Sequence, residues 1–217
     1  MALPTYLGLV NDILIRMREP EVSTVNENTL SKLIGKLVND SKRQVEDAYS
    51  WNALNSTLTV TTVAGTHNYV LTGSGTRFKV IEATDVTNKT TINALTTKMM
   101  SQYLLTSEQT GSPLYYNFNG LDSTGDTKVN VFPIPTAGLS LSFNLYIPQS
   151  ELSADSDTLF APKEPVILGA FARALVERGE DGGLNSSEAY GLYKASLADA
   201  IAIESSRYVE EDAWEAV

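Results

Sequence analysis

The chain has 217 residues, of which 16 are Lys or Arg, 26 are Asp or Glu, one is His and none is Cys. With 42% hydrophobic and 19% charged residues it has enough apolar side chains for a packed core, so we expect a globular protein. The absence of Cys excludes disulfide frameworks, thiolate zinc sites, thiol nucleophiles and iron–sulfur clusters.

The formal net charge of -10 is concentrated in the last third of the chain. Residues 1–55 hold 6 basic and 7 acidic side chains, residues 56–147 hold 5 and 5, and residues 148–217 hold 5 and 14, which gives -1, 0 and -9. Proteins that grip nucleic-acid phosphates need clustered Lys and Arg, so this distribution argues against that function. A solvated acidic helix face and a functional acidic surface both stay open.

We expect no secretory signal in the first twenty residues, because no basic segment precedes their apolar residues and Asp12 interrupts them. No apolar run approaches the roughly 18 to 20 residues of a membrane span. We therefore expect a protein with no membrane association that is made in a cytoplasm.

The first third of the sequence has the periodicity of two helices. Apolar residues recur at three- and four-residue steps and predict one helix over residues 3–19. A second stripe predicts a longer helix that ends near Ala48 and that Asn28 or Thr29 can cap. We expect Trp51 to pack where the chain leaves this helix.

From residue 56 the apolar period falls from about 3.6 to 2, which is typical of strands. Leu58 and Val60 alternate with threonines, and a turn at residues 64–66 leads into HNYVL, so these two segments are expected to pair as a hairpin. Further strand-like runs are RFKVIEATDV, PLYYNFN, TKVNVFPIP and LSLSFNLYIP, while residues 96–105 look helical. This spacing predicts an antiparallel sandwich or a small barrel.

The helical period returns after Pro162. One helix opens near Pro165 and is predicted to stop at Gly179. Another is predicted over about residues 186–206, with Ser186 or Ser187 as its cap. One side of this last helix carries its larger apolar residues: Tyr190, Tyr193, Leu197, Ile201 and Ala202.

Each helix has an apolar stripe that must be buried, and the pairs from the two ends of the chain can bury theirs together. We therefore predict an α+β fold, in which an antiparallel helical bundle carries an inserted antiparallel β subdomain and an extended C-terminal tail. The expected parts are residues 1–55 and 151–206 for the two halves of the bundle, 56–150 for the β subdomain and 207–217 for the acidic tail.

Residues with catalytic or ligand-binding chemistry are scarce. General acid–base catalysis and nucleophilic triads draw on His and Cys, and the one His, His67, falls in a turn. Asp155 and Asp157 form an Asp-x-Asp pair without the rest of a calcium loop, and residues 73–75 lack the rest of a phosphate loop. We expect no enzymatic activity, no cofactor and no metal site.

The last residues, SSRYVEEDAWEAV, set aromatic and aliphatic side chains among acidic ones. A segment that docks on another subunit can anchor through its aromatics and be oriented by its charges. We favour docking over a frayed terminus, which stays open as the alternative. The residues expected to make the contact are Tyr208, Val209, Glu211, Trp214 and Val217.

Five segments follow one another in a distinctive order: YLGLVNDIL from Tyr6, YSWNAL from Tyr49, TVTTVAGTHNY from Thr59, KVNVFPIP from Lys128, and the Pro162 entry to the helix over residues 166–178. In this order they resemble the head-to-tail adaptor, or connector, proteins of tailed bacteriophages, including the tail tubular protein A type. The resemblance covers nearly the whole chain, and the order of the segments carries it.

The resemblance implies a non-enzymatic virion protein of the tail or neck, made in the bacterial host cytoplasm. It would form a homo-oligomeric ring, expected to be a dodecamer, between the portal protein and the tail nozzle or next tail component. DNA would pass through the ring without sequence-specific binding. The C-terminal segment in this family often reaches the portal, which implies a portal-binding role for the five tail residues. The alternative is a glycan- or ligand-binding β module of another virion or surface protein, acting through Tyr103 or Tyr115.

Overall fold

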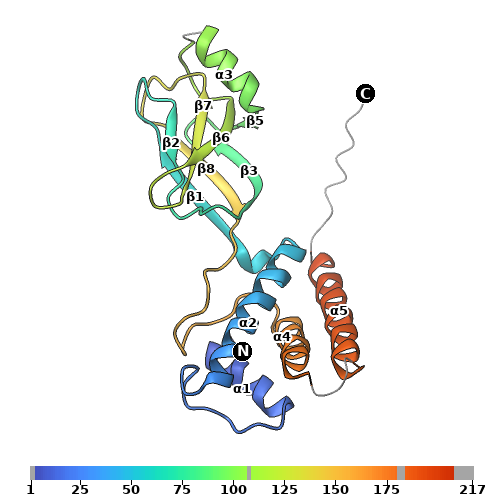
Figure 1. The fold of residues 1–217 in the computed structure, drawn as a ribbon. Helices are drawn as coiled ribbons and strands as arrows, with labels where there is room; N and C mark the ends of the chain where they lie inside the picture. Colours follow the sequence, from blue (N-terminus) through green and yellow to red (C-terminus); the bar gives the residue numbers. More distant parts are fainter. Residues whose placement is uncertain (1–2, 107–108, 180–183, 208–217) are drawn as a thin grey trace. The chain divides into compact units, whose positions relative to one another are not determined.

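The computed structural model describes residues 3–106, 109–179 and 184–207. Its contacts divide the chain into two compact units, one made of Met1–Ala53 and Gln149–Val217 and the other of Leu54–Pro148 (Figure 1). Both ends of the chain therefore contribute to one helical unit, and the middle of the chain forms a β unit. The predicted α+β class, with helices from both ends and an inserted β region, is confirmed.

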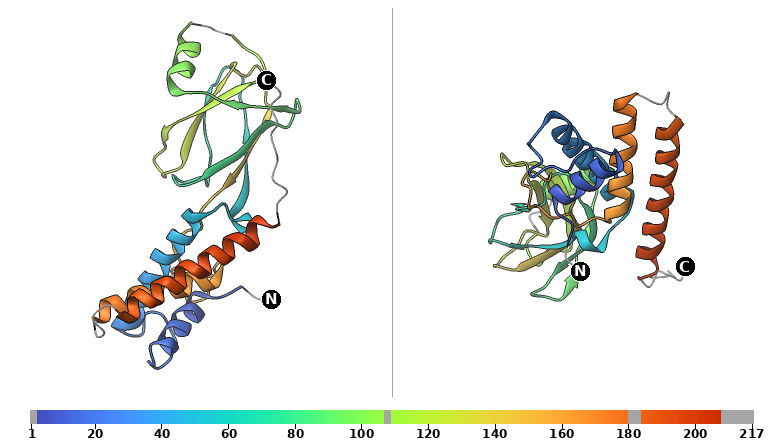
Figure 2. Two further views of the ribbon diagram at one scale, coloured as in Figure 1. Left: turned by 90° about the vertical axis from the view of Figure 1, so that its right-hand side faces the viewer. Right: turned by 90° about the horizontal axis from the view of Figure 1, so that it is seen from below.

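Four helices form the helical unit: α1 (Tyr6–Arg16), α2 (Thr29–Ala48), α4 (Lys163–Arg178) and α5 (Leu184–Ser205). Helix α4 packs against each of the other three, whereas α5 packs mainly against α4 (Figure 2). Helix α4 is thus the centre of this unit, and α5 lies at its edge.

Local sequence explains where most of these helices begin and end. The side chain of Asn28 accepts a hydrogen bond from Ser31 N at 2.8 Å and caps α2, as predicted. Gly179 ends α4 with a left-handed φ of 64°, which glycine adopts without steric cost. The expected capping of α5 by Ser186 or Ser187 is wrong, because the helix begins at Leu184 and both serines lie inside it.

The helices approach closely where glycine leaves room for an aromatic ring. The hydroxyl of Tyr6 on α1 and a methyl group of Val25 lie against Gly35 on α2, where a Cβ atom would overlap them. On α4, Gly169 lies close to the ring of Tyr193 from α5, where a Cβ atom would come within 3.1 Å of the ring. These glycines allow α1 to pack closely on α2 and α5 to pack closely on α4.

The β unit holds two open four-stranded sheets. The first has the order β1 (Asn55–Thr61), β8 (Ser140–Tyr146), β3 (Lys79–Asp85), β4 (Thr90–Thr91). The second has the order β2 (Asn68–Val70), β7 (Thr127–Phe132), β6 (Tyr115–Leu121), β5 (Asn93–Ala94). The pairs are antiparallel except for β5 with β6, which is parallel. The turn η1 (Asn52–Leu54) precedes β1, and α3 (Thr97–Thr106) contacts β6 and β7.

Side chains from both sheets share one core, which makes the unit a sandwich. Strand β8 alternates between buried and half-buried residues and contributes Leu141, Phe143 and Leu145. The facing residues include Val131 and Tyr116, and the Tyr116 and Phe143 rings meet edge to face with their centroids 5.5 Å apart.

The expected hairpin between the first two strands is wrong. Strand β1 pairs with β8, and β2 pairs with β7 in the other sheet. The chain between them runs along the segment before β8, where Thr62 N donates to Leu139 O and Gly65 N donates to Pro135 O, both at 2.9 Å. The segment therefore crosses from one sheet to the other, so the Gly65 turn does not close a two-stranded hairpin.

Substituting Gly35 with Ala tests the packing of α1 on α2. The added methyl group would overlap the Tyr6 hydroxyl, and overpacking of this kind costs about 1–3 kcal/mol of the free energy of unfolding. Gly191→Ala in α5 is the matched control, since its methyl group would meet no atom within 4 Å and Ala favours a helix over Gly by about 1 kcal/mol. Urea unfolding should show a loss for the first variant and none for the second; equal effects would refute the close approach.

Candidate functional site

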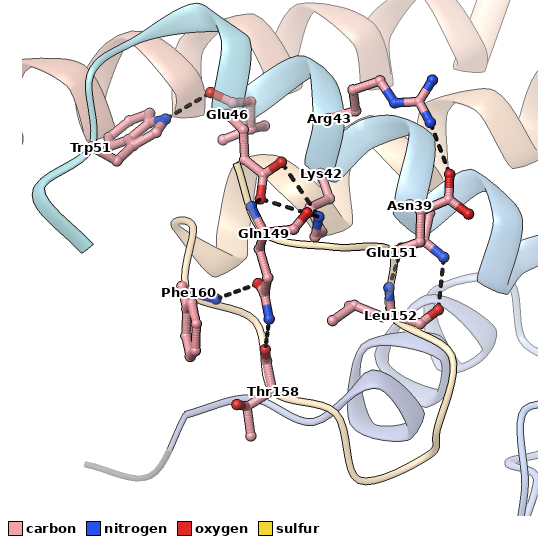
Figure 3. Close-up of polar contacts among 11 residues, drawn as sticks. Asn39, Lys42, Arg43, Glu46, Trp51, Gln149, Glu151, Leu152, Thr158 and Phe160 are labelled. Carbon is pink, nitrogen blue, oxygen red and sulfur yellow. Dashed lines mark hydrogen bonds and ion pairs between the residues drawn. The ribbon is translucent and has the colours of Figure 1, made fainter. Parts of the chain in front are cut away.

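Residues 149–162, which we call the strap, follow the β unit in the chain and lead to α4. Within the helical unit the strap lies along α2 (Figure 3). The side chain of Asn39 holds both backbone groups of Leu152, donating to its carbonyl at 3.0 Å and accepting from its amide at 2.9 Å. One turn further along α2, Arg43 forms an exposed ion pair of 2.8 Å with Glu151. The strap therefore meets α2 through polar contacts.

The start of the strap is fixed by a buried ion pair on α2. Lys42 Nζ lies 3.1 Å from Glu46 Oε1, and the two side chains are 3% and 1% exposed. Lys42 also donates to Gln149 O at 2.6 Å, and Glu46 accepts from Gln149 N at 3.3 Å (Figure 3). A buried ion pair stabilises a fold only when its remaining hydrogen-bonding groups have partners, and the backbone of Gln149 supplies them.

The side chain of Gln149 then folds the strap back on itself. Its amide nitrogen donates to Thr158 O at 2.5 Å, and its amide oxygen accepts from Phe160 N at 3.2 Å. These bonds place the end of the strap, with Phe160, beside its beginning (Figure 3).

The strap also pairs with the residues that open α1. Tyr6 N donates to Asp157 O at 2.7 Å, Leu159 N donates to Pro4 O at 2.9 Å, and Thr5 forms an isolated antiparallel bridge with Thr158. Burial, followed by the carboxylates of three strap residues, raises the pKa of the Tyr6 hydroxyl. The strap thus connects α1 to α2 before the chain enters α4.

The carboxylates of the two aspartates in the Asp-x-Asp segment accept hydrogen bonds from backbone amides. Asp155 accepts a hydrogen bond from Val25 N at 2.9 Å, and Asp157 accepts from Ser153 N at 2.7 Å and Ala154 N at 2.8 Å. The bonds from Ser153 and Ala154 favour the charged carboxylate and lower the pKa of Asp157. Among the described residues, no cluster of three or more His, Cys, Asp or Glu could hold a metal ion.

The outer face of α5 is exposed and mostly apolar, with the exposed Asp199 as a charged neighbour. We define it as the exposed residues Leu192, Ala195, Ala198 and Ala202, which follow one another at helical spacing. The buried side of the helix is marked instead by Ala189, Tyr193 and Glu204. The predicted apolar side is therefore only partly right, because Tyr193 is buried whereas Tyr190 and Ala202 are exposed.

A pocket of about 380 Å³ lies where α5 ends. We call it the α5-end pocket, and its lining residues are Trp51, Asn52, Ala53, Phe160, Pro162, Ala200, Ile203, Glu204 and Arg207. Its base is firmly built: Trp51 is buried and donates to Val45 O at 2.7 Å, and Glu204 accepts from Asn52 N at 2.9 Å. Its rim is apolar and open, with Phe160 44% and Ile203 59% exposed.

The residues predicted to make the docking contact lie outside the described residues: Tyr208, Val209, Glu211, Trp214 and Val217. The description ends at Arg207, which lines the α5-end pocket. His67 lies between β1 and β2, where its carbonyl accepts from Val131 N at 2.9 Å. Tyr103 stacks on Phe132 with ring centroids 5.2 Å apart.

Sequence reasoning missed both the ion pair under the strap and the α5-end pocket. Lys42 and Glu46 do have the i, i+4 spacing of a helical ion pair, but spacing does not reveal that both are buried. The pocket is lined by residues that follow α2, by the strap and by the end of α5 with Arg207, and sequence spacing does not predict that these segments lie together.

The family model of the SU10 adaptor protein matches residues 4–214. The chain belongs to the SU10 adaptor protein family. These proteins are phage head-to-tail adaptors, so the predicted class is confirmed, and the narrower likeness to tail tubular protein A stays a prediction. No curated protein is similar enough in sequence to count as a match.

Membership assigns this adaptor a structural, non-enzymatic role in which it binds neighbouring virion components. In the part of the chain that the structure describes, no helix has the length and apolar character needed to cross a membrane. The strap, the outer face of α5 and the α5-end pocket are therefore best judged as features of an assembly protein.

Replacing Lys42 with Met tests the buried ion pair of this adaptor. Glu46 would keep its buried charge without its partner, and breaking such a pair costs about 3–5 kcal/mol of the free energy of unfolding. Arg43→Met removes the exposed pair with Glu151 and should cost at most about 1 kcal/mol. Urea unfolding of both variants measures the difference, and equal losses would show that the buried pair does not hold the strap.

The pH dependence of stability tests Asp157. Its pKa in the folded adaptor lies below the ordinary value of 3.8, so its contribution is complete above that pH and is lost as the pH falls through the lowered pKa. Asp157→Asn should therefore destabilise the adaptor at neutral pH, with the difference from wild type shrinking below that value. Urea midpoints at a series of pH values give the curve, with Asp199→Asn as a control for charge loss alone. A difference that persists unchanged into acid would contradict the assignment.

Proposed function

We propose that this adaptor assembles as a homo-oligomeric ring, a dodecamer, between the portal protein and the tail nozzle or next tail component. Two observations support the proposal together: the family match over residues 4–214 and the uncovered apolar face of α5. The adaptor would then belong to the tail or neck of the virion after synthesis in the host cytoplasm. Its β unit would face the nozzle, as in the tail tubular protein A type.

The contact between ring subunits is assigned to the outer face of α5. An exposed row of apolar and small residues on a helix marks a contact surface, and α5 has α4 as its main helical neighbour in its own chain. The alanines at positions 195, 198 and 202 have short side chains that let another helix approach closely. A copy of the same chain is the expected neighbour, because repeated heterologous contacts close into rings.

The charge of the chain suits a passage for DNA. A net charge of -10 gives weak or repulsive fields towards phosphates, whereas DNA binding needs clustered cations that release counterions. DNA would therefore pass through the ring without sequence-specific binding.

The portal contact is assigned to the C-terminal segment. Trp and Tyr are the residues that most often carry binding energy at interfaces, and Trp214 and Tyr208 stand among acidic residues that can steer the segment onto a basic surface. The contact set is Tyr208, Val209, Glu211, Trp214 and Val217. The alternative function, glycan binding by the β unit, has less support, because Tyr103 is engaged with Phe132 and Tyr115.

Ala198→Glu tests the subunit contact. The substitution places a charge in the middle of the outer face of α5, where Ala198 is exposed and Glu is a good helix former, so folding should be unaffected. Ring formation in the presence of portal should fall at least tenfold by mass photometry, because a buried unpaired charge opposes association. Gln102→Glu on α3 adds the same charge outside the helical unit and should leave assembly unchanged. Rings that form normally from the Ala198 variant would exclude this face.

Trp214→Ala tests the portal contact. Loss of an aromatic anchor should weaken binding to the portal by about 30-fold, the equivalent of a 2 kcal/mol hot spot. Surface plasmon resonance on immobilised portal gives the affinity, and Val176→Ala, at an exposed apolar residue of α4, is the control. Wild-type affinity in the Trp214 variant would show that the segment does not bind the portal.

A further inference from the structure

The α5-end pocket is a built site with an apolar opening. Trp51 and Glu204 are held at its base by hydrogen bonds, while Phe160 and Ile203 leave much of their apolar surface exposed at the rim. Its volume of about 380 Å³ exceeds that of one indole side chain. Exposed apolar surface around a preformed hollow marks a place where another apolar group binds.

The chain continues directly from the rim of this pocket. Helix α5 ends at Ser205, Arg207 N donates to Glu204 O at 3.1 Å, and Arg207 itself lines the pocket. The remaining segment, residues 208–217, is YVEEDAWEAV. Trp214 stands seven residues after Arg207, so an extended chain could carry it up to about 24 Å, and one reversal of direction returns it to the pocket.

The chemistry of the segment matches that of the pocket. Its largest apolar side chain is Trp214, and the pocket offers the rings of Trp51 and Phe160 with the Ile203 side chain. Four acidic residues surround Trp214 in sequence, and Arg207, which is two-thirds exposed, lines the pocket beside its ion-pair partner Glu204 at 3.4 Å.

We propose that Trp214 of the same chain occupies the α5-end pocket in the free protein. Binding of the portal then withdraws the segment and makes Trp214 available, a second step that rests on the proposed function. Because the site lies where the segment begins, the effective concentration of Trp214 at the pocket is high without any partner. The docked state covers apolar surface before assembly, and the portal must compete with the pocket for the same aromatic residue.

The two tryptophans of the chain allow a direct test by fluorine NMR. The full chain labelled with 5-fluorotryptophan gives one resonance for Trp51 and one for Trp214, and Trp214→Phe assigns them. A labelled peptide of residues 208–217 gives the solvated reference. We expect the H₂O/D₂O isotope shift of Trp214 in the full chain to be several-fold smaller than in the peptide, because the ring is shielded from water. A full isotope shift would overturn the proposal.

Substitutions at two exposed apolar residues distinguish docking of Trp214 in the pocket from shielding of Trp214 elsewhere on the protein. Ile203→Asp places a charge on the pocket wall and should move the Trp214 resonance to the position of the peptide. Val176→Asp on α4 makes the same change at 65% exposure, outside the pocket lining, and should leave the resonance in place. Trp51 should stay shielded in both variants, which verifies the fold. A Trp214 signal that Ile203→Asp does not move would exclude this pocket.

Dilution identifies which copy supplies the tryptophan. Docking within one chain leaves the Trp214 resonance independent of protein concentration, whereas a shift to the solvated position on dilution would assign the occupant to a second copy and refute the proposal. Portal binding is scored separately by the affinity of Trp214→Ala. A shielded Trp214 together with unchanged portal affinity of the Trp214→Ala variant would support docking and reject the portal contact. A solvated Trp214 together with weakened portal affinity would reject docking and support the portal contact.

Discussion

The helical unit depends on the buried ion pair between Lys42 and Glu46. Both charges are almost completely removed from water, and the backbone carbonyl and amide of Gln149 form hydrogen bonds with them. The pair therefore holds the start of the strap against α2. The strap leads into α4, which contacts the other three helices, so this ion pair lies at the start of the connection to the central helix.

The strap also forms part of the α5-end pocket. Gln149 holds Phe160 beside the start of the strap, and Phe160 and Pro162 then form one wall of the α5-end pocket. Helix α5 closes the other side, held through Glu204 to the backbone of Asn52. The proposed subunit contact and one wall of the α5-end pocket thus lie on α5, whose main helical neighbour in its own chain is α4.

Much of the fold follows from periodicity, and the exceptions have physical causes. The change from a period of 3.6 to 2 and back located the helices and most strands, since one-sided burial imposes those repeats. The predicted pairing of β1 with β2 was wrong, because alternation in a strand shows which residues share a face but not which strand lies next to it. Thr62 and Gly65 instead form hydrogen bonds with the chain before β8. The two-residue strands β4 and β5 are too short to produce any alternation.

The sequence by itself determined the class of fold, the shortage of catalytic chemistry and, through the order of its segments, the adaptor family. It could do so because helix periods, capping residues and composition are local properties. Only the tertiary structure decided that Lys42 and Glu46 are buried, that Asp155 and Asp157 hold backbone amides, and that one side of α5 is left uncovered. These features depend on which distant segments of the chain pack together, and the sequence pattern of one segment does not specify its neighbours.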